Sequence, residues 1–417
     1  MIKSLLRLLR WSEKYTRTDM VYLASGGFWT AFNYSFGVLA GLITTIAFAN
    51  LMDPTDYGTY QFVLSLTSII GIFTLTGMGV AINRAVAQGH DGAFLYGLKA
   101  KLRWSIGITI AGGLLAGYYY LNDNQTLALS MLIAGALSPF FVSFRLYEHY
   151  LYGKKFFKHA SILETIRKLF PTTAIITALL LTDNLIIIIT TYFAGNTISY
   201  IICHYHVVKK YKPPLEIYTE GLNFSKHLSV MKIIGAIAGQ ADKILVWHFL
   251  GALAVATFSI AQLATKYSGG VLNAITGIAL PKLATRDLPT LQKTLPRKVL
   301  LFSGVMSIFA LSYIVIAPLA FPILFPLYPE AIPLTQLLAL TLLFIPRSLY
   351  SKALHAHAQT RALYISNITL PIIKLTLLLL LLPTYGIWGA VYALLLSGLI
   401  ETVVVYTLFK RAKPLET

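Results

Sequence analysis

The chain has 417 residues, of which 56% are hydrophobic and 12% charged, with a mean hydropathy of +0.69 and a net charge of +18. This composition excludes an ordinary soluble domain, because the apolar residues form runs long enough to cross a bilayer core of about 30 Å. The single cysteine, Cys203, excludes an intrachain disulfide. We therefore expect an all-α integral membrane protein.

Residues 1–19 are expected to form a basic amphipathic segment on the cytoplasmic face of the membrane. Their five Lys and Arg residues recur at spacings of three and four, while leucines and a tryptophan occupy other faces of the helix. This pattern is typical of a helix that rests on an anionic bilayer surface. The segment lacks the uninterrupted apolar core of a signal peptide.

Twelve membrane spans are expected, and the basic residues between them indicate their orientation. They lie near residues 21–50, 58–84, 104–121, 126–146, 160–182, 184–207, 227–250, 256–281, 299–324, 331–351, 362–383 and 385–408. Connections after even-numbered spans contain clusters of Lys and Arg, whereas those after odd-numbered spans contain none. The positive-inside rule then places both termini in the cytoplasm. The charge of +18 reflects this topology, so no nucleic-acid partner is expected.

The spans are expected to form two pseudo-symmetric lobes of six helices each, because the two halves of the chain resemble each other. Residues 51–87 and 249–285 share small residues, glycines and a Thr-aromatic pair at a constant offset of 198 residues. Repeats of this kind build many secondary transporters. The expected domains are a cytoplasmic segment at 1–19, an N-terminal lobe at 20–208, a cytoplasmic linker at 209–223, a C-terminal lobe at 224–410 and a cytoplasmic tail at 411–417.

No enzymatic or metal-dependent function is expected. The sequence contains no P-loop for ATP and no large outer loop that would hold a glycan polymerase or ligase domain. Two His-x-His pairs occur, but residues two apart on a helix point to different faces, so a metal site is not expected. No nucleophile with a neighbouring base can be assembled from the sequence. We therefore predict no cofactor.

Polar residues inside the spans define the expected substrate site. A charge at the bilayer centre costs about 2.5–3.5 kcal/mol on insertion scales, so it usually faces a cavity or a partner. The candidates for binding an anion are Lys243, Lys266, Lys374, Lys232 and Arg84. The expected polar lining of the cavity is Asn33, Gln61, Gln240, Gln262, Asn273 and Asn367. Two alternatives stay open, namely that Lys232 only extends to the membrane surface and that Asp242 and Lys266 form a structural pair.

Two motifs indicate a family. The first span is followed by Asp56-Tyr57-Gly58-Thr59-Tyr60, and the second span is glycine-rich and ends at Arg84. The seventh span contains Asp242-Lys243 before apolar residues and is followed by Leu250-Gly251. Both motifs resemble those of the Wzx-type oligosaccharide flippases, which translocate lipid-linked O-units. These are polysaccharide-biosynthesis proteins of the MOP exporter superfamily, which also contains the MATE drug exporters and the lipid II flippase.

The resemblance implies a V-shaped bundle in the bacterial cytoplasmic (inner) membrane that flips undecaprenyl-diphosphate-linked oligosaccharides by alternating access. The glycans would serve surface polysaccharides such as the O-antigen of lipopolysaccharide. The implied partners are this glycan substrate, membrane lipids, H⁺ or Na⁺, and the polysaccharide polymerase machinery. Asp242 is the first candidate for ion coupling, because a buried carboxylate can titrate in the working pH range. Glu164 and Glu401 are further candidates.

Two other functions remain open at this stage. A MATE-like exporter of cationic drugs or metabolites has the same fold, but its cavity is expected to contain acidic residues, and lysines prevail here. A membrane scaffold within an envelope-synthesis complex would perform no transport, but it has little need of charged residues inside its spans.

Overall fold

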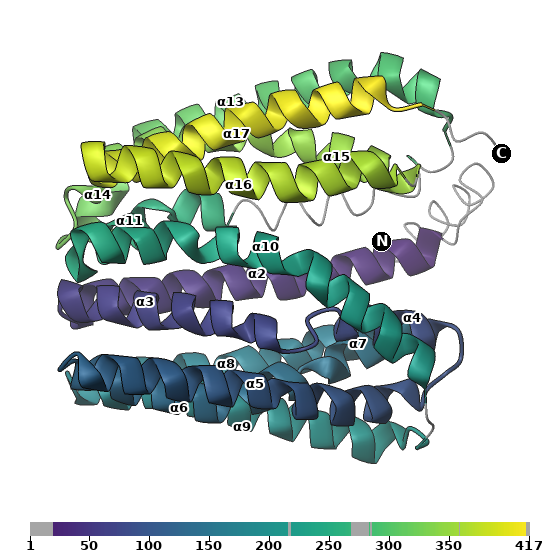
Figure 1. Cartoon of the computed structure of the whole chain (residues 1–417), viewed down its shortest axis with the longest axis horizontal. Coiled ribbons are helices and arrows are strands. Elements are labelled where there is room, and N and C mark those ends of the chain that lie inside the picture. Colours follow the sequence, from purple (N-terminus) through teal and green to yellow (C-terminus); the bar gives the residue numbers. More distant parts are fainter. Residues whose placement is uncertain (1–19, 216–217, 268–282, 284–285, 358, 414–417) are drawn as a thin grey trace, which may run out of the picture. The chain divides into compact units, whose positions relative to one another are not determined.

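The computed structural model describes residues 20–215, 218–267, 283, 286–357 and 359–413, with side chains described from residue 26 onward. This part of the chain is helical and contains no strand (Figure 1). Its helices are α2 (Met20–Leu51), α3 (Pro54–Ile70), η1 (Gly71–Phe73), α4 (Met78–Ala87), α5 (Ala93–Leu121), α6 (Gln125–Phe144), α7 (Leu146–Gly153), α8 (Phe157–Leu181), α9 (Leu185–Tyr211), α10 (Thr219–Leu250), α11 (Ala252–Ala261), α13 (Leu288–Leu324), α14 (Ala331–Ala339), η2 (Leu340–Arg347), α15 (Ser348–Ala356), α16 (Thr360–Tyr385) and α17 (Ile387–Arg411).

Within the described residues, eight helices are long and apolar enough to cross a membrane. A ninth is obtained if the bent pair Pro54–Phe73 and Met78–Ala87, with an angle of 58° between its parts, counts as one span. Side chains on the outer faces are strongly apolar, and Leu300, Leu319 and Ile323 of α13 are each more than 70% exposed. The chain is therefore a multi-pass membrane protein. The total of twelve spans and the cytoplasmic position of both termini stay predictions, and the eighth expected span lies mostly outside the described residues.

The helices group into two compact units. The first unit contains the described residues up to Thr44 together with Ile70–Met231, and the second unit contains Thr45–Ile69 and the described residues from Lys232 onward. The chain therefore passes between the units inside α2, at the end of α3 and inside α10. The two six-helix lobes expected from the sequence stay a prediction, and Thr45–Ile69 groups with the C-terminal half of the chain in this structure.

In the first unit, small residues allow α5 and α6 to pack closely. A Cβ atom built on Gly112 would lie 2.7 Å from the Cα of Gly135, and Thr109 donates a hydrogen bond of 2.9 Å to the Gly135 carbonyl. Such glycine contacts bring membrane helices together without large side chains. Aromatic side chains fill the core beside them, since Tyr147 and Tyr150 are almost completely buried.

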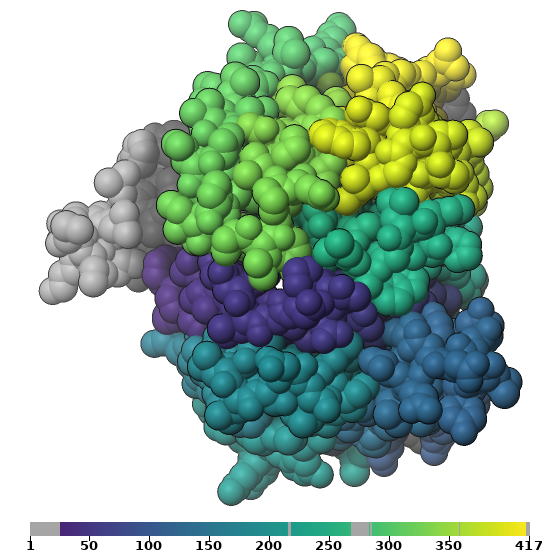
Figure 2. Space-filling view, turned by 90° about the vertical axis from the view of Figure 1, so that its left-hand side faces the viewer, coloured from purple at the N-terminus to yellow at the C-terminus, as the bar shows by residue number. Residues whose placement is uncertain are grey.

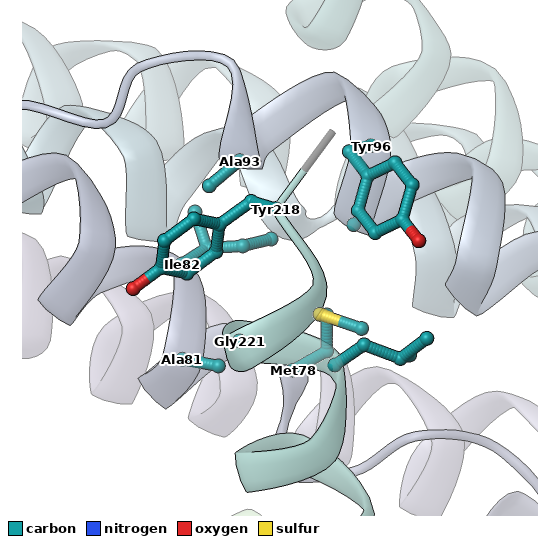
Figure 3. Close-up of a pocket in the computed structure, with 9 residues that line it drawn as sticks. Met78, Ala81, Ile82, Ala93, Tyr96, Tyr218 and Gly221 are labelled. Carbon is teal, nitrogen blue, oxygen red and sulfur yellow. The ribbon is translucent and has the colours of Figure 1, made fainter. Parts of the chain in front are cut away.

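The beginning of α10 packs into a crevice between α4 and α5 of the first unit. Tyr218, Gly221 and Leu222 lie there against Met78 and Ile82 (Figure 3). The remaining cavity is about 10 Å³, which is close to the minimum for one water molecule. The crevice is therefore a packing contact that fixes the end of the linker, and it is too small to hold a substrate.

In the second unit, the Tyr-Gly motif of α3 packs directly on the turn between α10 and α11. Gly58 lies so close that a Cβ atom would be 1.8 Å from the Ala252 carbonyl oxygen. The turn itself needs a glycine, because Gly251 has a φ of +82°. One turn further along α3, the ring of Phe62 stacks on Trp247 with centroids 4.1 Å apart. These contacts fix α3 against α10 and therefore fix the position of Gln61, which lies next to Phe62 in the sequence.

The helices that follow complete the second unit. The α16 and α17 helices pack along each other, and α14, η2 and α15 form one interrupted helix against α13 and α17. The space-filling view shows this interrupted helix in light green beside α17 in yellow (Figure 2). The eight residues of η2 form a 3₁₀-helix that contains Pro346. Because proline has no N–H group, the Leu343 carbonyl three residues earlier lacks its 3₁₀ donor, and it accepts a hydrogen bond of 3.1 Å from Ser303 instead.

Replacement of Gly58 by alanine is expected to destabilise the protein, because the new methyl group would overlap the Ala252 carbonyl. Overpacking of this kind costs about 1–3 kcal/mol, so the thermal unfolding midpoint in detergent should fall clearly. Gly304→Ala is the control, since Gly304 lies in α13 with nothing within 4 Å of an added Cβ. Equal midpoints for Gly58→Ala and the control would contradict the close contact.

Candidate functional site

Four of the residues expected at the substrate site and the first ion-coupling candidate, Asp242, meet in the second unit. Asp242 and Lys243 lie side by side on α10, Gln61 is on α3, Gln262 follows α11 and Lys374 is on α16. They are joined by hydrogen bonds and one ion pair. We call these five residues the polar cluster.

Lys243 anchors one half of the polar cluster. Its ammonium group donates a hydrogen bond of 2.9 Å to the Oε1 atom of Gln61. The Gln61 amide in turn donates a bond of 3.0 Å to the hydroxyl group of Tyr57, which is completely buried. The amide of Gln61 is neutral and supplies no counter-charge, so the ammonium group of Lys243 is available to pair with an anionic ligand.

Asp242 organises the other half. The side chain of Asp242 is buried, and its Oδ2 atom accepts a hydrogen bond of 2.8 Å from Gln262 and lies 3.9 Å from the Nζ atom of Lys374. Lys374 also donates a bond of 2.8 Å to the carbonyl of Ala238, one turn earlier on α10. One carboxylate therefore balances only one of the two lysines, and the polar cluster carries an excess of positive charge.

The described partner of Asp242 thus differs from the one considered in the sequence analysis. Lys266 does not form an ion pair with Asp242 among the described contacts; its ammonium group lies 5.3 Å from the ring centroid of Tyr267. Lys266 still acts electrostatically on Lys243 and repels its charge. Lys374 takes the place beside Asp242 because α16 packs near α10 at the level of Ala238.

The two remaining basic candidates lie outside the polar cluster. Lys232 is exposed and lies at the first residue of α10 that belongs to the second unit. Arg84 is an exposed residue of the first unit, and its guanidinium group lies 5.4 Å from the ring centroid of Phe224. Their expected roles in substrate binding stay predictions.

The other polar candidates have different surroundings. Asn33, in the first unit, accepts a hydrogen bond of 2.7 Å from Lys168 through its side chain. Gln240 is half-buried on α10, and Asn367 is exposed on α16 two helical turns before Lys374. Asn273 lies outside the described residues.

Glu164 lies in a buried ionic group of the first unit that sequence reasoning largely missed. Its carboxylate accepts hydrogen bonds from Tyr147 and Arg167, with 3.0 Å between Oε2 and the Arg167 guanidinium. The same guanidinium lies 4.2 Å from the ring centroid of Tyr200. The spacing of three residues between Glu164 and Arg167 was a visible signal for this pair. Because Glu164 is held by two partners, its surroundings are those of a structural ion pair.

A cavity of about 460 Å³ opens beside the polar cluster within the second unit. Gln262 and Lys374, which belong to the polar cluster, form part of its wall, and the ion pair of Arg347 with Glu401 forms another part. The complete lining is Gln262, Thr265, Leu338, Thr341, Phe344, Ile345, Arg347, Ser348, Ser351, Lys374, Leu394, Ser397, Gly398 and Glu401. Sequence reasoning selected Gln262, Lys374 and Glu401 but not the other residues of the wall, because they come from separate elements: α14, η2, α15, α16, α17 and the segment after α11.

No metal site is formed by the residues that the structure describes, since no three His, Cys, Asp or Glu side chains converge there. The histidines of the two His-x-His pairs have other surroundings. His204 is buried with its ring 4.9 Å from that of Phe144, and His355 lies at the end of α15.

Comparison with solved structures identifies the fold. The inward closed conformation of the lipid II flippase MurJ superposes with a TM-score of 0.71 at 15% identity, covering 92% of this chain and 86% of that one. An inward-facing MATE family multidrug resistance transporter of the MOP superfamily gives 0.70 at 13% identity, covering 89% and 93%. An outward-facing MATE structure gives 0.65 at 13% identity, covering 94% of each chain. The chain therefore has the MOP/MATE-like fold.

Sequence comparison gives the family. No curated protein matches the chain by sequence. Residues 23–285, which are more than half of the chain, match the family described as "Polysaccharide biosynthesis protein". This range includes both motifs noted in the sequence and, of the polar cluster, all residues except Lys374. The chain belongs to the polysaccharide biosynthesis protein family.

Proposed function

We propose that the protein is a flippase that moves undecaprenyl-diphosphate-linked oligosaccharide units across the bacterial cytoplasmic membrane by alternating access. The product would serve the synthesis of a surface polysaccharide such as an O-antigen, beside a polysaccharide polymerase. The observation that carries the proposal is the polar cluster, in which two lysines meet one carboxylate inside a membrane-embedded unit. The family description and the MOP/MATE-like fold support it.

The charge of the polar cluster suits a diphosphate. A lipid diphosphate must lose water when its head group enters the membrane, and fixed positive charges offset that cost. A unit charge pair 4 Å apart gains about 4 kcal/mol at an effective dielectric constant of 20. Lys243 is the main candidate to contact the diphosphate, because its described partner, Gln61, is neutral. A cationic drug would be repelled by the same lysines, which disfavours a MATE-like cargo.

Asp242 has a different role from the lysines, because it competes with the substrate. It neutralises Lys374 while the site is empty, and it competes with the diphosphate for that lysine once the substrate enters. Uptake of H⁺ or Na⁺ at Asp242 would shift this competition, because it would remove the negative charge that holds Lys374. Asp242 therefore remains the proposed coupling residue, because its charge acts directly on Lys374 of the polar cluster, whereas Glu164 and Glu401 are paired with arginines outside that cluster.

Loss of the lysines is expected to stop transport. In proteoliposomes with a fluorescent polyprenyl-diphosphate sugar, Lys243→Ala, Lys266→Ala and Lys374→Ala should each lower the initial rate of leaflet exchange at least tenfold, because each removes a positive charge near the diphosphate. The matched control is Lys298→Ala, which changes an exposed lysine of α13. Each variant must elute as a folded protein at the position of wild type.

The possible outcomes test the lysine binding site and the flippase activity separately. Exchange by wild type that persists in all three variants would reject the lysines as the binding site. Absence of exchange in folded wild-type protein, with several sugar head groups tested, would reject the flippase proposal itself.

Removal of the charge of Asp242 is expected to tighten binding and slow transport. Asp242→Asn keeps an oxygen for the hydrogen bond from Gln262 but leaves Lys374 without its counter-ion. The Kd for the polyprenyl-diphosphate sugar, measured in detergent micelles, should fall about tenfold, which corresponds to about 1.4 kcal/mol. The rate of leaflet exchange should fall at the same time, because release becomes slower. Asp287→Asn, at the exposed start of α13, is the control. An unchanged or larger Kd would contradict competition between Asp242 and the diphosphate.

A further inference from the structure

We infer that the cavity beside the polar cluster is a saccharide subsite, which receives an uncharged sugar residue of the head group next to the diphosphate. The inference rests on the proposed function and adds to it a second binding element inside the second unit. The cavity is built by α14, η2, α15, α16, α17 and the segment after α11, all of which belong to that unit.

The size and polarity of the cavity fit a sugar. Its volume of about 460 Å³ lies within the roughly 300–1,000 Å³ of small-ligand sites. Nine of its 14 lining residues have a polar side chain, although the surrounding helices present apolar side chains to the membrane. A cavity with such a wall is unfavourable for a lipid tail, because the tail would bury the polar groups without hydrogen bonds. A ligand rich in hydroxyl groups satisfies them.

The cavity offers donors and acceptors in comparable numbers. Ser348, Ser351 and Ser397 contribute hydroxyl groups. The Ser397 hydroxyl donates to the Leu394 carbonyl and offers a ligand its acceptor lone pairs. Arg347 and Glu401 are paired with each other, so the guanidinium supplies further donors and the carboxylate further acceptors while their charges cancel. Sugar hydroxyls need both kinds of partner. Because the charges of Arg347 and Glu401 cancel, this part of the wall attracts neither an anion nor a cation, and it suits an uncharged residue.

One wall of the cavity is aromatic. Phe344, in the 3₁₀-helix η2, is half-exposed and lies over Gly398 of α17, where an added Cβ atom would be 2.8 Å from the ring. Because Gly398 has no side chain, the ring can lie flat against the helix and still border the cavity. The C–H face of a sugar ring is apolar and packs on aromatic rings. The cavity thus combines an apolar face with polar edges, as a pyranose ring does.

The position of the cavity matches the order of groups in the substrate. Lys374 and Gln262 border the cavity and also contact Asp242 in the polar cluster. A diphosphate held at the polar cluster therefore has its next group, which is the first sugar of a lipid-linked glycan, at the entrance of the cavity. No rearrangement of the second unit is needed for the two groups to bind together.

Binding of free sugars tests the subsite without lipid. Wild-type protein in nanodiscs is mixed with the methyl glycosides of glucose, galactose, N-acetylglucosamine and N-acetylgalactosamine, and saturation-transfer NMR detects contact with the protein. At least one glycoside should give a signal that falls at least tenfold in Ser397→Leu, whose side chain fills the cavity. Ser307→Leu is the matched control, because Ser307 also donates to a backbone carbonyl of its own helix but does not line the cavity. Glu401→Gln, which keeps the shape of the wall, should weaken the signal through loss of an acceptor charge.

The outcomes distinguish this inference from the proposed function. If wild type performs leaflet exchange but no glycoside gives a signal, or if the signal is the same in Ser397→Leu and Ser307→Leu, the subsite is overturned and the flippase proposal stands. If a glycoside binds in a Ser397-dependent manner but folded wild type exchanges no lipid-linked sugar, the subsite stands and the flippase proposal fails.

Discussion

The cost of a charge inside the membrane determines how the second unit is built. Asp242 is buried, and it is tolerated there because Gln262 donates to it and Lys374 lies 3.9 Å away. Lys243, next to it on α10, finds its partner on α3 instead. A single pair of adjacent charged residues thus ties α10 to three other segments of the chain. Each of those contacts also fixes the position of a side chain of the polar cluster.

This arrangement requires α3 and α10 to lie very close together. Only a glycine at position 58 permits the approach, since a Cβ atom would overlap the Ala252 carbonyl. The stacked rings of Phe62 and Trp247 then fix the rotation of both helices, which directs Gln61 towards Lys243. The Tyr-Gly motif that resembles the flippase family therefore has a clear physical basis in this chain: it sets the distance on which the polar cluster depends.

The sequence was sufficient to predict the helical class, most helix positions and the residues of the polar cluster, because long apolar runs and rare internal charges are local signals. The partners within the cluster were not predictable. Asp242 and Lys266 are close in sequence, yet the described ion pair joins Asp242 to Lys374, 132 residues away. That choice depends on how α16 packs against α10, which no local pattern encodes. The interruption of the α-helix at η2 could not be predicted from the sequence either, since Pro346 alone does not distinguish a kinked α-helix from eight residues of 3₁₀-helix.

The ion pair of Arg347 and Glu401 illustrates why the cavity and the interrupted helix belong together. A partly buried ion pair is weak evidence for stability, because the cost of removing two charges from water offsets much of their attraction. Arg347 is the last residue of η2, and its side chain also donates a hydrogen bond of 3.1 Å to the carbonyl of Phe344. The guanidinium thus satisfies the irregular backbone and the carboxylate of α17 at once. The result is a polar stretch of wall, with its two charges balanced, in an apolar environment, and such a surface favours a hydrated or hydroxylated occupant over an apolar one.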